Sequence, residues 1–138
     1  MVFCSHALAQ DIQEIHKAAG SGDVAKIKSL LKSNPELVKA VDNRSATPLH
    51  YAINDHQKAV AEILLTNKAD INAQDDAGRT PLFRAVSRES ADMVDFLVAH
   101  KADVNIQSKS GTIPLKVALL TNQTDVAKLL RKHGAKEE

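Results

Sequence analysis

Apolar residues recur at three-to-four spacing in short segments of this chain, and polar stretches containing glycine or proline separate these segments. Such spacing places the apolar side chains on one face of a helix, so each segment is expected to form an amphipathic helix. The same face returns every 33 residues, as Val60-Ile63-Leu64, Met93-Phe96-Leu97 and Val126-Leu129-Leu130. The pattern therefore predicts one helical unit that is repeated along the chain.

A second marker keeps the same period and predicts another helix in each unit. Pro48, Pro81 and Pro114 are 33 residues apart. Proline is tolerated in the first turn of a helix, and a preceding threonine can cap it. The motif residues assigned to this structural role are Thr47, Pro48, Leu49, His50, Thr80, Pro81, Leu82, Pro114 and Leu115.

A third marker lies between these helix pairs. Lys68-Ala69-Asp70-Ile71-Asn72 matches Lys101-Ala102-Asp103-Val104-Asn105, and Gly134-Ala135 begins another copy. Asp42 and Asp75 are expected to open a turn in which Gly78 and Gly111 supply permissive backbone. A degenerate copy precedes these at a spacing of 34, with the extra residue near Pro35. The markers together predict repeats at about 11–41, 42–74, 75–107 and 108–138.

The 33-residue period and the Thr47-Pro48-Leu49-His50 motif resemble the ankyrin-repeat family. The resemblance implies an all-α solenoid of about four stacked helix–turn–helix repeats with projecting β-turn loops. It covers a single repeat domain over 10–138. It also implies that His50 hydrogen-bonds to the turn of an adjacent repeat rather than acting in catalysis.

Several residues depart from the family pattern. Lys68 and Lys101 stand where the family usually has a helix-ending glycine, so we expect both in the left-handed conformation at a cost of about 1 kcal/mol. Ile113 replaces the capping threonine and Ser108 the turn aspartate in the last repeat. We therefore expect this repeat to have the weakest turn hydrogen bonding.

The first nine residues leave two interpretations open. Ala7-Leu8-Ala9 has the small-x-small pattern that signal peptidase cleaves, which would make 1–9 the tail of a signal peptide and the mature protein exported to the bacterial periplasm. A basic start and a longer apolar run are missing. In the other interpretation 1–9 is a disordered or helical lead-in to a cytoplasmic protein.

Composition and motifs exclude several classes of function. Lys and Arg number 18 against 17 Asp and Glu, so the chain lacks the basic surplus of a nucleic-acid binder. No apolar run is long enough to span a membrane. Cys4 is the single cysteine and cannot form an internal disulfide. No catalytic, metal-binding or phosphate-binding pattern is present, so we expect no enzyme activity, no cofactor, no metal and no small-molecule substrate.

Binding of another protein is the function that the resemblance implies. In ankyrin stacks the loop tips and the exposed side of the first helices form a concave binding face. The corresponding residues are Arg44, Tyr51, Asn54, Asp55, Asp76, Arg79, Arg84, Ser87, Arg88, Lys109 and Thr121. Tyrosine and arginine are favoured at interface hot spots, so Tyr51, Arg79, Arg84 and Arg88 are the expected anchors. The arginines favour a partner with acidic surface groups.

Three roles remain possible at this stage. The chain could inhibit or regulate a partner, such as an envelope enzyme in the periplasm with a self-protection or stress role. It could be a cytosolic inhibitor similar to the ankyrin proteins that cap kinases. It could also be a scaffold fragment of a larger assembly. The residues themselves do not name the partner.

Overall fold

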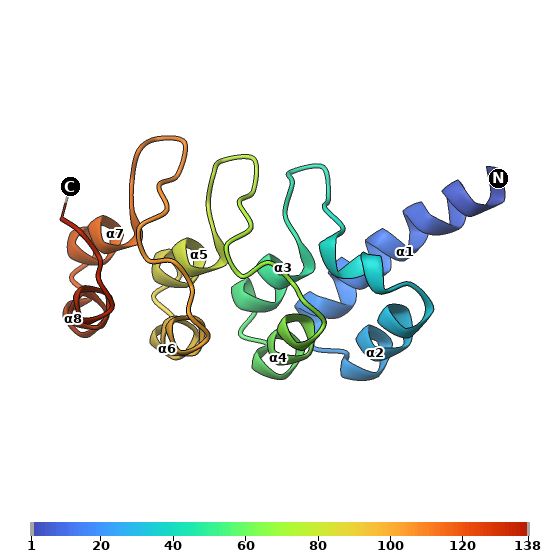
Figure 1. Ribbon diagram of the computed structural model, residues 1–138, viewed down its shortest axis with the longest axis horizontal. Coiled ribbons are helices and arrows are strands. Elements are labelled where there is room, and N and C mark those ends of the chain that lie inside the picture. The colour runs from blue at the N-terminus through green and yellow to red at the C-terminus, as the bar shows by residue number, and fades with distance from the viewer. Residues whose placement is uncertain (1, 138) are drawn as a thin grey trace. The chain divides into compact units, whose positions relative to one another are not determined.

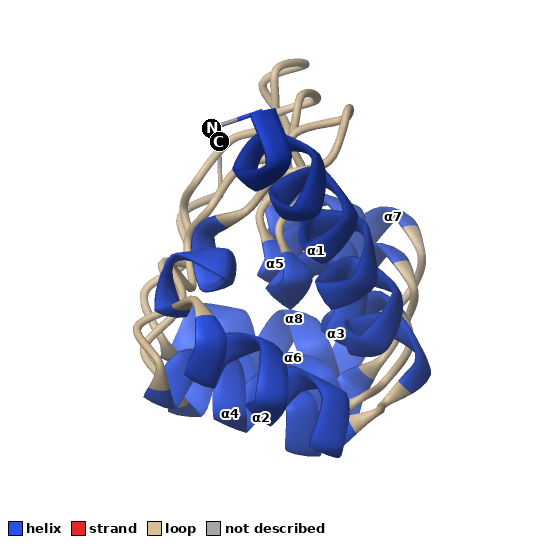
Figure 2. Ribbon diagram, turned by 90° about the vertical axis from the view of Figure 1, so that its right-hand side faces the viewer, coloured by secondary structure: helices blue, strands red, loops and turns tan. Residues whose placement is uncertain are grey.

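The computed structural model describes the backbone of residues 2–137 and the side chains of residues 7–137. The side chain of Cys4 lies outside this part. Helices and loops make up the described chain, which contains no strand, and this confirms the predicted all-α class (Figure 2). None of the described helices has the length and hydrophobicity needed to cross a membrane. The chain divides into two compact units, Met1–Asp70 (unit 1) and Ile71–Glu138 (unit 2).

Unit 1 consists of two helix pairs and a short connecting helix (Figure 1). The elements are α1 (Val2–Ser21), α2 (Val24–Ser33), the 3-10 helix η1 (Pro35–Lys39), α3 (Pro48–Asn54) and α4 (Lys58–Thr66). Helix α1 packs against α2 and α3, and α2 packs against α4. The extra residue of the first repeat is accommodated in η1, where Asn34 caps the helix and Pro35 begins it.

Helix α1 is 20 residues long, whereas α3 has seven. The difference follows from the residues at the motif position. Thr47 and Pro48 cap and begin α3, but Gln13 and Glu14 stand at the corresponding place in the first repeat. Neither residue stops a helix, so α1 continues toward the N-terminus and includes residues 2–9. Whether those residues are cleaved is a separate question that the helix does not answer.

Unit 2 contains two helix pairs that repeat the same design. They are α5 (Pro81–Ser87) with α6 (Ala91–Ala99), and α7 (Pro114–Leu120) with α8 (Thr124–Lys132). Helix α5 packs on α7, and α6 packs on α8. Two asparagines tie the repeats together, because Asn72 accepts a hydrogen bond from the Asp103 N–H and Asn105 accepts one from the Lys136 N–H, each at 2.9 Å.

The three loops between successive helix pairs close in the same way. We name them tip loops 42–46, 75–79 and 108–112; in each, the first N–H donates to the carbonyl of the fifth residue at 2.9–3.0 Å. Gly78 and Gly111 have positive φ, as predicted. Glycine is needed at position 78 for a second reason, since a Cβ there would lie 2.7 Å from the Lys109 backbone N.

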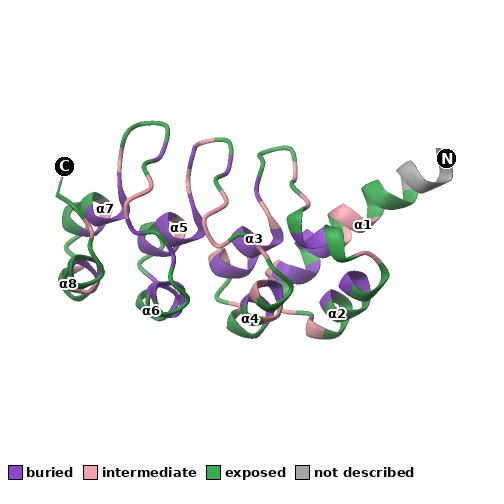
Figure 3. Cartoon of the chain, in the orientation of Figure 1, coloured by how far each residue is buried: buried purple, intermediate pink, exposed green. Residues whose placement is uncertain are grey.

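The core lies between the two helices of each pair and between neighbouring pairs within a unit (Figure 3). Leu49, Leu82 and Leu115 are at most 1% exposed, which confirms that the motif leucines point inward. Small residues at Ala52, Ala85 and Ala118 are buried beside them. Because alanine adds little bulk, the short helices can approach each other closely.

Candidate functional site

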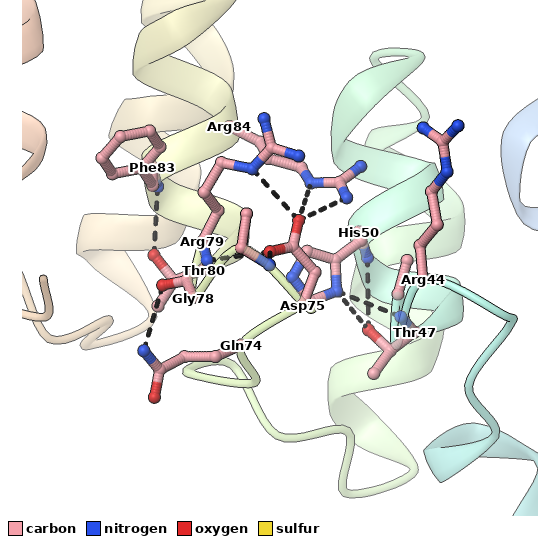
Figure 4. A network of polar contacts seen from close by, with 12 residues as sticks. Arg44, Thr47, His50, Gln74, Asp75, Gly78, Arg79, Thr80, Phe83 and Arg84 are labelled. Carbon is pink, nitrogen blue, oxygen red and sulfur yellow. Dashed lines mark hydrogen bonds and ion pairs between the residues drawn. The ribbon is translucent and has the colours of Figure 1, made fainter. Parts of the chain in front are cut away.

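A buried carboxylate organises the tip loop 75–79 of unit 2. The Asp75 side chain is fully buried and accepts hydrogen bonds from Arg84 Nη2 at 2.6 Å and from Arg79 Nε at 3.3 Å (Figure 4). Its other oxygen accepts the backbone N–H groups of Ala77 and Arg79 at 2.9 Å. Burial raises the pKa of Asp75, but the hydrogen bonds and the Arg84 charge outweigh it and lower that pKa.

Unit 1 uses a different side chain at the same position of the repeat. The Tyr51 hydroxyl donates to Asp42 at 2.5 Å, and the backbone N–H groups of Arg44 and Ala46 donate to the other carboxylate oxygen. Burial again raises the pKa of Asp42, while these hydrogen bonds lower it further than burial raises it. Tyr51 and Arg84, two of the predicted anchors, therefore each hold a tip loop in place.

The last repeat lacks this arrangement. Ser108 replaces the aspartate, and its hydroxyl accepts the Thr112 N–H at 3.4 Å, compared with 2.9 Å for the equivalent contact to Asp75. Val117 stands at the position of Tyr51 and Arg84. Ile113 precedes α7 and cannot cap it with its side chain, whereas Thr47 and Thr80 both cap their helices. The expected weakening of turn hydrogen bonding is thus present in the geometry.

The two histidines at the motif position differ in the partner of Nδ1. His50 is fully buried, and its Nδ1 accepts the Thr47 N–H at 3.1 Å in a capping box (Figure 4). His16, its counterpart on α1, has Nδ1 at 2.7 Å from the Ile12 carbonyl and Nε2 at 2.8 Å from the Ala46 carbonyl. Within unit 1, His16 therefore contacts the neighbouring tip loop 42–46. The contact with an adjacent turn that the resemblance implied for His50 stays a prediction.

One of the predicted partner contacts of unit 1, Tyr51, lines a hollow in the surface of this unit. Arg44 and Asp55 are exposed, and Asn54 and Tyr51 are half-buried. The hollow has a volume of about 530 Å³ and is lined by Ala9, Ile12, Gln13, His16, Lys17, Val41, Asp42, Asn43 and Tyr51. The motif alignment did not reveal the contribution of α1, because it gave no indication of how far this helix extends.

The predicted contacts of unit 2 lie on α5, at the residues that directly follow α5 and α7, and in two adjacent tip loops. The loops are joined by a hydrogen bond of 2.8 Å from the Lys109 N–H to the Ala77 carbonyl. The exposed members of the set are Asp76, Ser87, Arg88, Lys109 and Thr121. Arg79 is half-buried, and the Arg84 side chain is only 16% exposed. The structure thus leaves Arg88 as the most accessible of the predicted arginine anchors in unit 2.

Sequence reasoning missed an apolar hollow on α7. Its volume is about 230 Å³, and Ile113, Leu115, Lys116, Leu119, Leu120 and Glu137 line it. Leu119 is 45% exposed and Leu120 71%, although Ile53 and Val86 at the position of Leu119 are buried. The adjacent leucines were a visible signal, because a helix this short cannot bury both in one core.

The carboxylates of tip loops 42–46 and 75–79 serve the loops themselves. Among the described side chains no group of histidine, cysteine and carboxylate residues could hold a metal ion. Asp42 and Asp75 are occupied by turn hydrogen bonds. In a comparison with known families, a model described as ankyrin repeats in three copies matches residues 11–75 and 60–138.

Proposed function

Because this chain belongs to the ankyrin-repeat family, we propose that it binds a partner protein and thereby inhibits or regulates it. Ankyrin repeats are protein–protein interaction modules. We assign the contacts to the exposed residues of the tip loops and first helices, among them Arg44 in unit 1 and Arg88 in unit 2. The observation that carries this assignment is that both cationic side chains are exposed on hydrogen-bonded backbone, Arg44 in tip loop 42–46 and Arg88 at the C-terminal end of α5.

The chemistry of these surfaces supports a partner with acidic surface groups. Arg44, Arg88 and Lys109 are exposed, and arginine is a preferred hot-spot residue. Asp55 and Asp76 are exposed among them, so we expect discrete contacts rather than general attraction of anions. The pattern Ala7-Leu8-Ala9 is our reason to look first in the bacterial periplasm, where an envelope enzyme would be the target.

The test is capture of the partner by the full chain from extracts of the source cell, separated into periplasmic and cytoplasmic fractions. The decisive variant is Arg44→Glu/Arg88→Glu, which reverses exposed charges and leaves the loop-holding residues Tyr51 and Arg84 intact. Lys128→Glu/Lys132→Glu on α8 is the matched control, because it makes the same change of charge on exposed residues outside the proposed surfaces.

We expect one partner to be retained by the parent chain and the control, and the decisive variant to bind it at least tenfold more weakly. An inhibitory role further requires that the purified partner lose activity when the parent chain is added. Equal retention by all three proteins would place the interface elsewhere. Capture from the cytoplasmic fraction alone would overturn the periplasmic setting.

A further inference from the structure

The surroundings of His16 differ from those of His50 in a way that fixes its protons. His50 accepts a backbone N–H at Nδ1, so that nitrogen carries no proton. At His16 each ring nitrogen faces a carbonyl oxygen instead, at 2.7 and 2.8 Å. The cause is the length of α1. This helix continues through the repeat position that corresponds to Thr47, the cap of α3. The ring of His16 therefore faces the Ile12 carbonyl instead of a capping residue.

Carbonyl oxygens can only accept hydrogen bonds, and a neutral imidazole has only one N–H to donate. Both His16 distances are hydrogen-bond lengths, so both contacts are satisfied only when the ring carries two protons. The ring is 4% exposed, and a buried cation needs a compensating charge. The Asp42 carboxylate provides this negative charge. Burial raises the pKa of Asp42, but hydrogen bonds and the His16 charge lower it further than burial raises it.

We propose that His16 is a proton-operated clamp between α1 and the tip loop 42–46. In its doubly protonated form, Nε2–H holds the Ala46 carbonyl. When the ring loses a proton, Nδ1 keeps the remaining one, because its bond to a carbonyl four residues earlier is local. His100 and His133 make the same local contact at 2.8 and 3.0 Å. The bond to Ala46 is the one that is lost.

The charges near His16 determine the direction of the effect. Lys17, Asp42 and Tyr51 line the same hollow, while Lys26 of α2 is paired with Glu14, and Glu36 and Lys39 of η1 are paired with each other. Imidazole is the side chain whose charge changes between pH 5 and 8, and Asp42 stays ionised there because its pKa is lowered. The clamp is therefore closed at the acidic end of this range and opens as the pH rises.

The clamp would control the position of Arg44, which lies in the same loop. If the proposed function holds, partner binding through unit 1 becomes stronger as the pH falls; that consequence rests on the proposed function, whereas the clamp itself does not. The experiment below uses the chain without any partner, so the two can fail separately.

The test follows the ring and the loop together from pH 5 to 8. Nitrogen-15 NMR of the histidine side chains reports which nitrogens of His16 carry protons, and hydrogen exchange reports the protection of the Arg44 and Ala46 amides after correction for intrinsic rates. We expect both nitrogens to be protonated at pH 5 and only Nδ1 at pH 8. Amide protection in this loop should fall about tenfold over the same interval, as expected when a charged hydrogen bond is lost.

Controls separate the clamp from general effects of pH. Protection in tip loop 75–79 should stay constant in the same samples. His16→Gln should remove the pH dependence in tip loop 42–46, whereas His100→Gln, which alters a histidine with a single carbonyl contact, should preserve it. A His16 ring with one proton throughout, a ring with two protons at pH 8, or a loop whose protection ignores the titration would each overturn the proposal, and these NMR results need no variant.

Discussion

At the scale of single residues, Lys68 and Lys101 have φ values of 72° and 69°, the left-handed conformation that the sequence predicted. Gly134 occupies the same position in the last repeat. A side chain with a Cβ is strained in this conformation, and glycine is not. The two lysines are exposed, so replacing them removes no buried contact.

We therefore expect Lys68→Gly and Lys101→Gly each to raise the free energy of unfolding by up to about 1 kcal/mol. This value includes the entropic cost of ordering glycine, which is more flexible than lysine in the unfolded chain. The thermal midpoint should rise by about 2–4 °C. Thermal unfolding followed by circular dichroism measures this. Lys68→Ala retains the Cβ and should give no such gain. Unchanged midpoints for both glycine variants would contradict the strain argument.

Asp75 makes the stability of the protein depend on pH. Its folded-state pKa is lowered because the hydrogen bonds to Arg84 and the loop backbone outweigh burial. A lowered pKa stabilises the folded state above the unfolded carboxyl value of about 3.9, and the stabilisation is lost as pH falls through the folded-state value. Asp75→Asn should cost about 2 kcal/mol at pH 7 and weaken the acid dependence.

Urea unfolding at pH 7 and at several values below pH 5 tests this prediction. The difference between the parent chain and Asp75→Asn should shrink as the pH falls. Asp76→Asn is the control, because Asp76 is the exposed neighbour in the same loop and should leave the profile unchanged. A constant difference between the parent chain and Asp75→Asn across the pH range would argue against an ionised Asp75 in the folded state.

At the scale of elements, the tip loops 75–79 and 108–112 share one backbone design but differ in the side chains that hold it. Asp75 accepts hydrogen bonds from two arginine side chains and two backbone N–H groups. Ser108 instead contacts the Ser110 hydroxyl at 2.9 Å and accepts one long backbone hydrogen bond from Thr112. Hydrogen exchange should therefore be faster at Thr112 than at Arg79 once intrinsic rates are removed.

Rebuilding the missing contacts in the last repeat extends this test. Ser108→Asp/Val117→Arg places a carboxylate and an arginine at the positions of Asp75 and Arg84. The double variant should slow exchange at Thr112 more than the sum of the single changes, since an unpaired buried carboxylate gains little. Additive effects of the two substitutions would indicate that the arginine does not reach the loop.

At the scale of the whole molecule, the exposure of residues 7–9 of α1 bears on where the repeat domain begins. Ala7, Leu8 and Ala9 are exposed, and from residue 7 onward the first fully buried side chain of α1 is Ile15. We expect the chain 10–138 to unfold within about 0.5 kcal/mol of the full chain, as is usual for changes away from the core. Urea unfolding of both chains measures the difference. A loss of several kcal/mol would show that residues 1–9 belong to the folded domain.

The sequence by itself determined the repeat, its period, the helix pairs and the left-handed positions of Lys68 and Lys101. These features are local: they depend on helical periodicity, proline in the first turn, threonine caps and conformational freedom at helix ends. The residues that carry them recur every 33 positions, so each copy supports the interpretation of the others. The candidate binding residues followed from the same alignment, and their contact with a partner stays a prediction.

Only the tertiary structure decided what the side chains on these elements do. It tied Tyr51 and Arg84 to Asp42 and Asp75, and it gave His16 a second carbonyl from a loop 30 residues away. Such contacts depend on distances between segments that are remote in sequence, and a repeat alignment contains no such distances. Equivalent positions therefore hold histidines whose Nδ1 atoms face different groups, a backbone N–H at His50 and a carbonyl at His16, because the helix that carries His16 continues through the position where Thr47 caps α3.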